Sequence, residues 1–146
     1  MSAYRDAFRA VAASWRQALQ WTSILLPPLV AFTDNVGSIQ IVVGQSMFPT
    51  LNPNQSSMLL DMVWVSKTCD FRPGDVVMLK DPIRERPTRI IKRVSEVSND
   101  GSLVYVLGDN RDHSTDSRSF GFVPSVMVEG VVTRVIFPPW RVSKVN

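Results

Sequence analysis

Residues 88–97 read Thr-Arg-Ile-Ile-Lys-Arg-Val-Ser-Glu-Val, and their β-branched side chains favour an extended strand. Similar stretches rich in valine, isoleucine and leucine lie at residues 38–43, 58–65, 75–80, 102–107 and 126–137. Turn-forming residues separate them, at 52–54, 72–75, 81–82 and 99–101. Short strands joined by such turns predict a mainly β domain, folded as a barrel or a sandwich.

Length and composition exclude several classes of protein. The 146 residues suit one domain, and the net charge of +3 is too small to indicate a nucleic-acid partner. With one cysteine, Cys69, and one histidine, His113, the chain cannot form an internal disulfide or a four-ligand zinc site of Cys and His. Any hydrolase built on a Ser-His or Cys-His pair would have to use His113.

The first 34 residues differ in composition from the rest. Residues 1–20 carry three arginines and one aspartate, with apolar residues at helical spacing, which predicts a basic amphipathic helix. Residues 18–32 are uncharged but contain Pro27 and Pro28, and they fall short of the roughly 20 apolar residues of a straight spanning helix. We expect residues 1–34 to form this start and a single transmembrane helix, and residues 35–146 to form the β domain. A surface helix, a buried core helix and a cleaved signal peptide are the alternatives.

Two short segments could carry chemistry. Residues 44–50, GQSMFPT, place Ser46 between a flexible glycine and a rigid proline, on a loop that can expose its Oγ atom near backbone N–H groups. Lys92 lies inside an apolar strand, where alternation puts it on one face with Ile90 and Val94. Burial there would lower its pKa and suit it to act as a general base. Taken alone, an ordinary turn and a lysine that extends to solvent remain the simpler interpretations.

A third segment, residues 108–121, is dense in Asp, Ser, Asn and Arg between two glycines. It could be a solvated loop whose side chains satisfy its own backbone. A calcium loop is disfavoured because the Asp-x-Asp-x-Asp-Gly order and the final glutamate are missing, and because Arg111 and Arg118 would repel a cation.

Taken in order, these segments resemble the motifs of the signal peptidase I family, the Ser/Lys membrane proteases. Residues 44–50 resemble the nucleophile motif, and residues 72–77, RPGDVV, resemble the Arg-x-Gly-Asp strand. Residues 91–94, IKRV, resemble the Lys-Arg box, and residues 108–121 are similar to the Gly-Asp-Asn box. The resemblance covers roughly residues 39–137, and it implies a signal-peptidase-like β-barrel or sandwich with an N-terminal helix or membrane anchor.

The resemblance also implies the roles of individual residues. Ser46 matches the nucleophile and Lys92 the general base. Ser114 matches the serine that orients the lysine, while Asp116 and Arg118 match a supporting pair. Some members of the family use a serine hydroxyl two positions before the nucleophile to stabilise the oxyanion. Gly44 stands there in this chain, so the backbone N–H of Ser46 is the remaining donor that the sequence can name.

Other interpretations stay open. The resemblance leaves His113 as a loop residue, and a triad of Ser46, His113 and an aspartate is the rival mechanism. A catalytically silent subunit that only stabilises a partner protease is a second hypothesis, and a soluble self-cleaving Ser/Lys regulator is a third. No metal or other cofactor is implied.

The resemblance implies a membrane-bound serine endopeptidase that removes signal or sorting peptides from precursor proteins. The segments at residues 59–65, 81–89 and 137–141 are similar to the mitochondrial branch of the family, and the arginine-rich start suits mitochondrial import. This branch implies the mitochondrial inner membrane, with the catalytic domain facing the intermembrane space and a related protease subunit as partner. A small bacterial type I signal peptidase in the plasma membrane is the alternative.

Overall fold

The computed structural model describes residues 2–53, 60–84 and 88–145, and within the first helix it describes side chains at residue 15 and from residue 17 onward. The chain separates into two units, Met1–Asn35 and Val36–Asn146. Two residues of the strand predicted at 58–65, residues 58 and 59, lie outside the described part.

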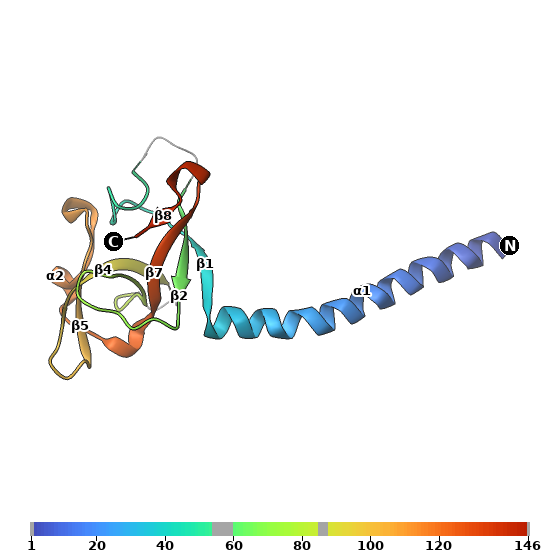
Figure 1. Ribbon diagram of the computed structural model, residues 1–146, viewed down its shortest axis with the longest axis horizontal. Coiled ribbons are helices and arrows are strands. Elements are labelled where there is room, and N and C mark those ends of the chain that lie inside the picture. Colours follow the sequence, from blue (N-terminus) through green and yellow to red (C-terminus); the bar gives the residue numbers. More distant parts are fainter. Residues whose placement is uncertain (1, 54–59, 85–87, 146) are drawn as a thin grey trace. The chain divides into compact units, whose positions relative to one another are not determined.

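The first unit is one α-helix, α1, which runs from Ser2 to Asn35 (Figure 1). The amphipathic start and the apolar run predicted from the sequence are therefore parts of one continuous helix. Pro27 and Pro28 lie inside it, and neither can donate a backbone hydrogen bond to the preceding turn. No helix in the described part of the chain combines the length and the hydrophobicity needed to span a membrane.

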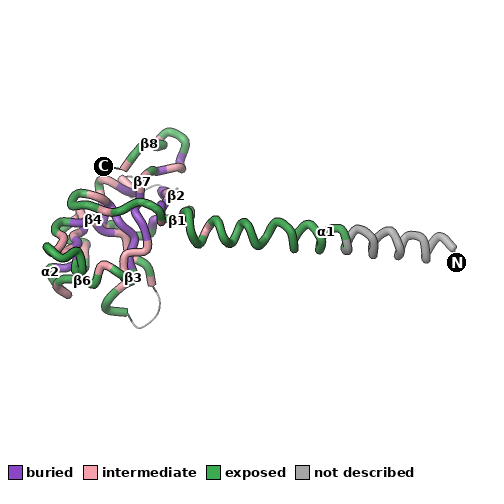
Figure 2. The backbone as a smooth tube through the Cα atoms, turned by 60° about the horizontal axis from the view of Figure 1, so that its bottom comes forward, coloured by how far each residue is buried: buried purple, intermediate pink, exposed green. Residues whose placement is uncertain are grey.

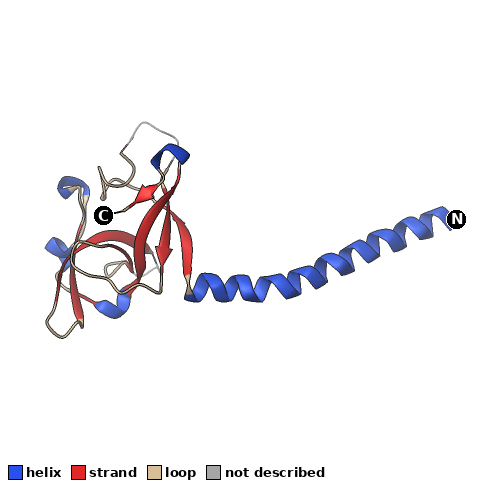
Figure 3. Cartoon of the chain, viewed as in Figure 1, coloured by secondary structure: helices blue, strands red, loops and turns tan. Residues whose placement is uncertain are grey.

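The second unit is mainly β, which confirms the predicted fold class (Figure 3). Its strands are β1 Gly37–Ile41, β2 Met62–Ser66, β3 Val76–Lys80, β4 Arg89–Val97, β5 Leu103–Leu107, β6 Val123–Pro124, β7 Val128–Phe137 and β8 Ser143–Lys144. Its helical turns are η1 Arg111–His113, α2 Ser117–Phe120, η2 Ser125–Met127 and η3 Pro139–Arg141. β6 and β8 were not predicted, because two residues are too few to show a period of two. The strand predicted from residue 126 begins only at Val128, after η2.

One curled antiparallel sheet holds the strands in the order β1-β2-β7-β3-β4-β5-β6, with β8 paired to β7. Buried residues lie along its inner strands (Figure 2). One core cluster contains Met47, Leu51, Val63 and Met78, and a second contains Val77, Leu79, Val94 and Val106. Because β1 and β4 line the same pocket although three strands separate them in the sheet, the curl must bring the end of β1 toward β4.

Candidate active site

Ser46 lies on a loop, residues 42–52, that follows β1 and that we call the Ser46 loop. Two residues of the core, Met47 and Leu51, anchor it, with exposed fractions of 2% and 1%. The N–H of Asn110 donates to the Ser46 carbonyl over 3.0 Å, so the segment of residues 108–121 holds the Ser46 loop in place. The two approach so closely at Gly108 that a Cβ atom there would lie 2.7 Å from the Ser46 carbonyl oxygen and would collide with the Ser114 hydroxyl. Gly108 is therefore required for steric reasons.

Lys92 is buried in β4, with 3% of its surface exposed. Its Nζ atom donates to Ser114 Oγ over 2.8 Å. Burial lowers the pKa of Lys92, because the ammonium loses its hydration; the nearby Asp116 carboxylate opposes this shift, and Arg118 reinforces it. As strand alternation predicted, Lys92 is buried, and its neutral form is therefore more favoured than that of a lysine in water.

Ser114 connects Lys92 to a buried ion pair. Its hydroxyl accepts from Lys92 and donates to Asp116 Oδ2 over 2.8 Å. Asp116 is fully buried, and Arg118 donates two hydrogen bonds to its carboxylate, from Nε over 2.9 Å and from Nη2 over 2.5 Å. Burial alone would raise the pKa of Asp116, but hydrogen bonds from Arg118, the Gly108 N–H and Ser114 outweigh burial and hold that pKa well below its usual range. Asp116 therefore stays charged and fixes the Ser114 hydroxyl.

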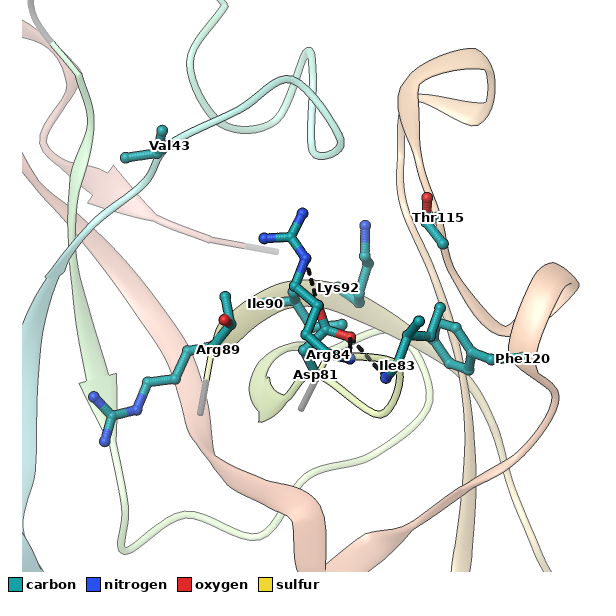
Figure 4. A pocket seen from close by; sticks show the side chains of 10 residues that line it. Val43, Asp81, Ile83, Arg84, Arg89, Ile90, Lys92, Thr115 and Phe120 are labelled. Carbon is teal, nitrogen blue, oxygen red and sulfur yellow. Dashed lines mark hydrogen bonds and ion pairs between the residues drawn. The ribbon is translucent and has the colours of Figure 1, made fainter. Parts of the chain in front are cut away.

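Ser46 and Lys92 meet in one pocket of about 250 Å³. Its walls come from the end of β1 and from the first half of β4 and include Ile41, Ile90 and Ile91. A larger neighbouring pocket, of about 560 Å³, shares Lys92 with it. Figure 4 shows the Lys92 side chain pointing away from β4, with Val43 on one side and Thr115 and Phe120 on the other.

His113 lies on η1 and is exposed. It is not among the described residues that line either pocket containing Lys92. The geometry therefore lends no support to a triad of Ser46, His113 and an aspartate.

Gly44 adopts a backbone φ of 97°, in the region that favours glycine. A Cβ atom there would meet no other heavy atom within 4 Å, so backbone strain rather than space disfavours a side chain. The loop geometry of this chain therefore favours glycine at position 44. Among the described residues, the Ser46 N–H has no hydrogen-bond acceptor.

Sequence reasoning missed a second polar cluster, formed by Thr50, Arg93 and Asp109. Arg93 donates to both carboxylate oxygens of Asp109, over 2.9 and 2.8 Å, and Thr50 Oγ1 donates to the same carboxylate over 2.6 Å. Arg93 also donates to the carbonyl of Gly74 over 2.7 Å. Thr50, Arg93, Asp109 and Gly74 each lie in a different one of the four motifs, so motif membership was the sequence signal that could have pointed to them. Only the fold shows that the Arg93 side chain connects the four motifs.

Comparisons with known proteins agree with this picture. Residues 95–137 match the family model described as signal peptidase, peptidase S26. That match includes Ser114, Asp116 and Arg118 but neither Ser46 nor Lys92. The chain is 32% identical over 136 residues to mitochondrial inner membrane protease subunit 2 of Mus musculus, covering 81% of this chain and 77% of that protein. The protein of the same name in Saccharomyces cerevisiae is 30% identical over 145 residues, covering 85% and 79%.

A third relative, mitochondrial ATP-independent inner membrane protease subunit 1b of Arabidopsis thaliana, is 30% identical over 129 residues, covering 74% of this chain and 73% of that protein. Together with the β domain, these matches define a peptidase of the signal peptidase type. The chain belongs to the S26 family of signal peptidases, as the motifs predicted. Within that family, its similar relatives include the subunits of the mitochondrial inner membrane protease.

Proposed function

We propose that this chain is a serine endopeptidase in which Ser46 is the nucleophile and Lys92 the general base. The observation that carries the proposal is the buried Lys92, which lines one pocket with Ser46 and is oriented by Ser114. A lysine acts as a base only when it is neutral, and burial lowers its pKa in that direction.

In the proposed reaction, neutral Lys92 accepts the Ser46 hydroxyl proton while Oγ attacks the carbonyl carbon of the scissile peptide bond. The Ser46 N–H stabilises the resulting oxyanion. The Lys92 ammonium then protonates the leaving amine, the C–N bond breaks, and an ester to Ser46 remains. Water, deprotonated by Lys92, hydrolyses this ester and restores both residues. Ser114 keeps Nζ in place throughout, because Asp116 fixes its hydroxyl.

The pocket walls suit an extended peptide. The Val42 N–H donates to the Asp61 carbonyl before β2, so the backbone groups of its neighbours Ile41 and Val43 point away from β2. Both neighbours line the pocket opposite the start of β4. A substrate strand pairing with this edge would place alternate side chains against Ile41 and Ile91. The small pocket, lined in part by the apolar side chains of Ile41 and Ile91, fits small residues before the cleavage site, as the family resemblance implies.

We further propose that the protein acts at the mitochondrial inner membrane, facing the intermembrane space, on precursor proteins with sorting peptides. The three relatives named above carry the inner membrane in their names and are called subunits, which supports both this location and a related subunit as partner. α1 would attach the enzyme to the bilayer. A single helix cannot bury its own apolar side chains, and those of Trp15, Trp21 and Leu25 are exposed on α1.

The test is cleavage of a precursor that carries a sorting peptide, by the purified full-length chain together with its partner subunit. Ser46→Ala and Lys92→Ala should each abolish cleavage, whereas His113→Ala should retain it. Full activity in Lys92→Ala, or loss of activity in His113→Ala alone, would contradict the proposed pair. Cleavage by the mixture with Ser46→Ala at the wild-type rate would assign catalysis to the partner.

A further inference from the structure

A third polar cluster lies at the end of the Ser46 loop, and the catalytic proposal does not use it. It consists of Asn52, Asp61 and Arg141. Asp61, just before β2, is a buried carboxylate with 2% of its surface exposed. Arg141 belongs to η3, just after β7. Because Met62 pairs with Phe137 between β2 and β7, the sheet brings these two residues together.

Asn52 closes the Ser46 loop at its base. Its N–H donates to Asp61 Oδ2 over 2.8 Å, and the Asp61 N–H donates in return to Asn52 Oδ1 over 2.7 Å. Its Nδ2 atom also donates to the Val42 carbonyl over 2.7 Å. These bonds join the first and last residues of the loop, and Asn52 itself adopts a left-handed φ of 52°, which asparagine tolerates better than most residues.

Arg141 completes the cluster from the C-terminal segment. Its Nη2 atom forms an ion pair with Asp61 Oδ2 over 3.0 Å and donates to the Thr50 carbonyl over 3.0 Å. The side chain of the same Thr50 donates to Asp109. Thr50 is thus held on one side through its hydroxyl and on the other through its carbonyl, four residues after Ser46.

The contacts suit positioning better than stabilisation. Burying an ion pair costs hydration, and such pairs add little net stability. Here the cost is larger still, since the Nε atom of Arg141 is buried without a hydrogen-bond partner among the described residues. What the pair does secure is geometry, because one guanidinium bridges a fixed carboxylate and a loop carbonyl.

We infer that Asp61 and Arg141, through Asn52 and Thr50, hold the Ser46 loop in the conformation that keeps Ser46 in the pocket it shares with Lys92. They are positioning residues, and their role in catalysis rests on the proposed Ser46–Lys92 pair. The segment after β7 thereby becomes part of the catalytic apparatus, although it lies 91 positions beyond Thr50 in sequence.

The test compares Arg141→Met with a matched control, Arg134→Met, whose arginine is exposed on β7. Amide hydrogen exchange of the full-length chain is followed by mass spectrometry, together with precursor cleavage. In Arg141→Met, peptides covering residues 42–52 should exchange about 10-fold faster, while those covering β3 and β4 keep the wild-type rate. The value of kcat should fall about 10- to 100-fold with KM nearly unchanged, because misplacement affects attack rather than binding. The control should match the wild type in both measurements.

Two further variants sharpen the result. Asp61→Asn should reproduce the faster loop exchange, and adding Arg141→Met to it should cause little further change, since the pair acts as a unit. The acid limb of the pH–rate profile should keep its midpoint in each variant, because neither residue contacts Lys92.

Wild-type exchange in residues 42–52 of Arg141→Met, or acceleration throughout the β domain, would overturn the inference. An unchanged kcat with faster loop exchange would also overturn it. Failure of the proposed catalytic pair would show itself differently, as cleavage by Ser46→Ala, and the exchange measurement would still decide whether the cluster holds the loop.

Discussion

The two faces of β4 place adjacent basic residues in opposite electrostatic surroundings. Lys92 reaches Asp116 only through the Ser114 hydroxyl, and burial lowers its pKa. Arg93, the next residue, contacts the Asp109 carboxylate directly, and this hydrogen bond raises its pKa. Each face of β4 thus pairs a basic residue with a carboxylate, and both groups are largely removed from water. A hydroxyl placed between the two leaves a lysine that can lose its proton, whereas direct contact makes a permanent structural pair.

The largest effect on this contrast is expected from replacing Lys92, the proposed general base. Lys92→Met should lower the cleavage rate about 1,000-fold or more at neutral pH, because no other neutral base lies beside Ser46 among the residues that line its pocket. Thermal unfolding should show that the variant is at least as stable as the wild type, since a poorly hydrated ammonium is replaced by an apolar side chain. A variant that is folded and fully active would contradict the role assigned to Lys92.

Asp109→Asn should affect the opposite face through stability and geometry together. It leaves the Arg93 guanidinium without its anionic partner, and with side chains 25% and 15% exposed the loss should be about 2 kcal/mol in the free energy of unfolding. Burial opposes ionisation of Asp109, but hydrogen bonds from Arg93 and Thr50 prevail and lower its pKa. The pair's contribution is therefore present above the pKa of an unfolded aspartate and is lost as the pH falls. Urea denaturation at several pH values between about 3 and 7 measures both effects; no difference from wild type at neutral pH would refute the pair's importance.

Asp116→Asn should shift the pH dependence of cleavage. The carboxylate raises the pKa of Lys92 and Arg118 lowers it, so removal of the negative charge leaves the arginine unopposed. The acid limb of the pH–rate profile should move to lower pH, while the maximal rate falls about 10-fold because a neutral amide holds the Ser114 hydroxyl less firmly than the carboxylate does. If the acid limb moved to higher pH instead, the charge of Asp116 could not be what sets the pKa of Lys92.

The stability of the fold should depend on the ionisation of Lys92. Because the folded state lowers this pKa below that of the unfolded chain, unfolding takes up a proton between the two values. The cost to stability is complete below the folded pKa and disappears as the pH rises toward 10.5. The difference in unfolding free energy between Lys92→Met and wild type should therefore shrink at alkaline pH. It should shrink by about 1.4 kcal/mol for every tenfold difference between the acid dissociation constants of Lys92 in the folded and unfolded chains. A difference that stays constant in denaturant unfolding between about pH 7 and pH 11 would argue against a depressed pKa.

The smallest effect is expected at an exposed pair, Arg89 with Glu129, where the arginine side chain is 56% exposed. Glu129→Gln should change the free energy of unfolding by about 0–1 kcal/mol, which urea denaturation at neutral pH measures. The Glu129→Gln variant is the reference against which the effects of the Lys92 and Asp109 substitutions on the two faces of β4 are compared. A loss as large as that of Asp109→Asn would show that charge pairing as such, rather than burial, governs stability here.

Much of the β domain could be predicted because its signals are local. Valine- and isoleucine-rich stretches and turn residues placed most strands within a few residues of their observed bounds, and they failed for β6 and β8, which are two residues long. The motifs likewise pointed to Ser46, Lys92, Ser114, Asp116 and Arg118. The membrane attachment of residues 1–34 and the catalytic roles of these residues stay predictions.

The amino-acid sequence alone determined the fold class and the family and named the candidate site residues, since periodicity, turn chemistry and short motifs are local properties of the chain. Only the tertiary structure decided which carboxylate faces which base. Asp116 contacts Lys92 through the Ser114 hydroxyl. Asp109 forms an ion pair with Arg93, and Asp61 forms one with Arg141. These contacts depend on strand pairing and on the curl of the sheet, and burial then sets their electrostatics, because a charge removed from water responds to whichever partner the fold places beside it.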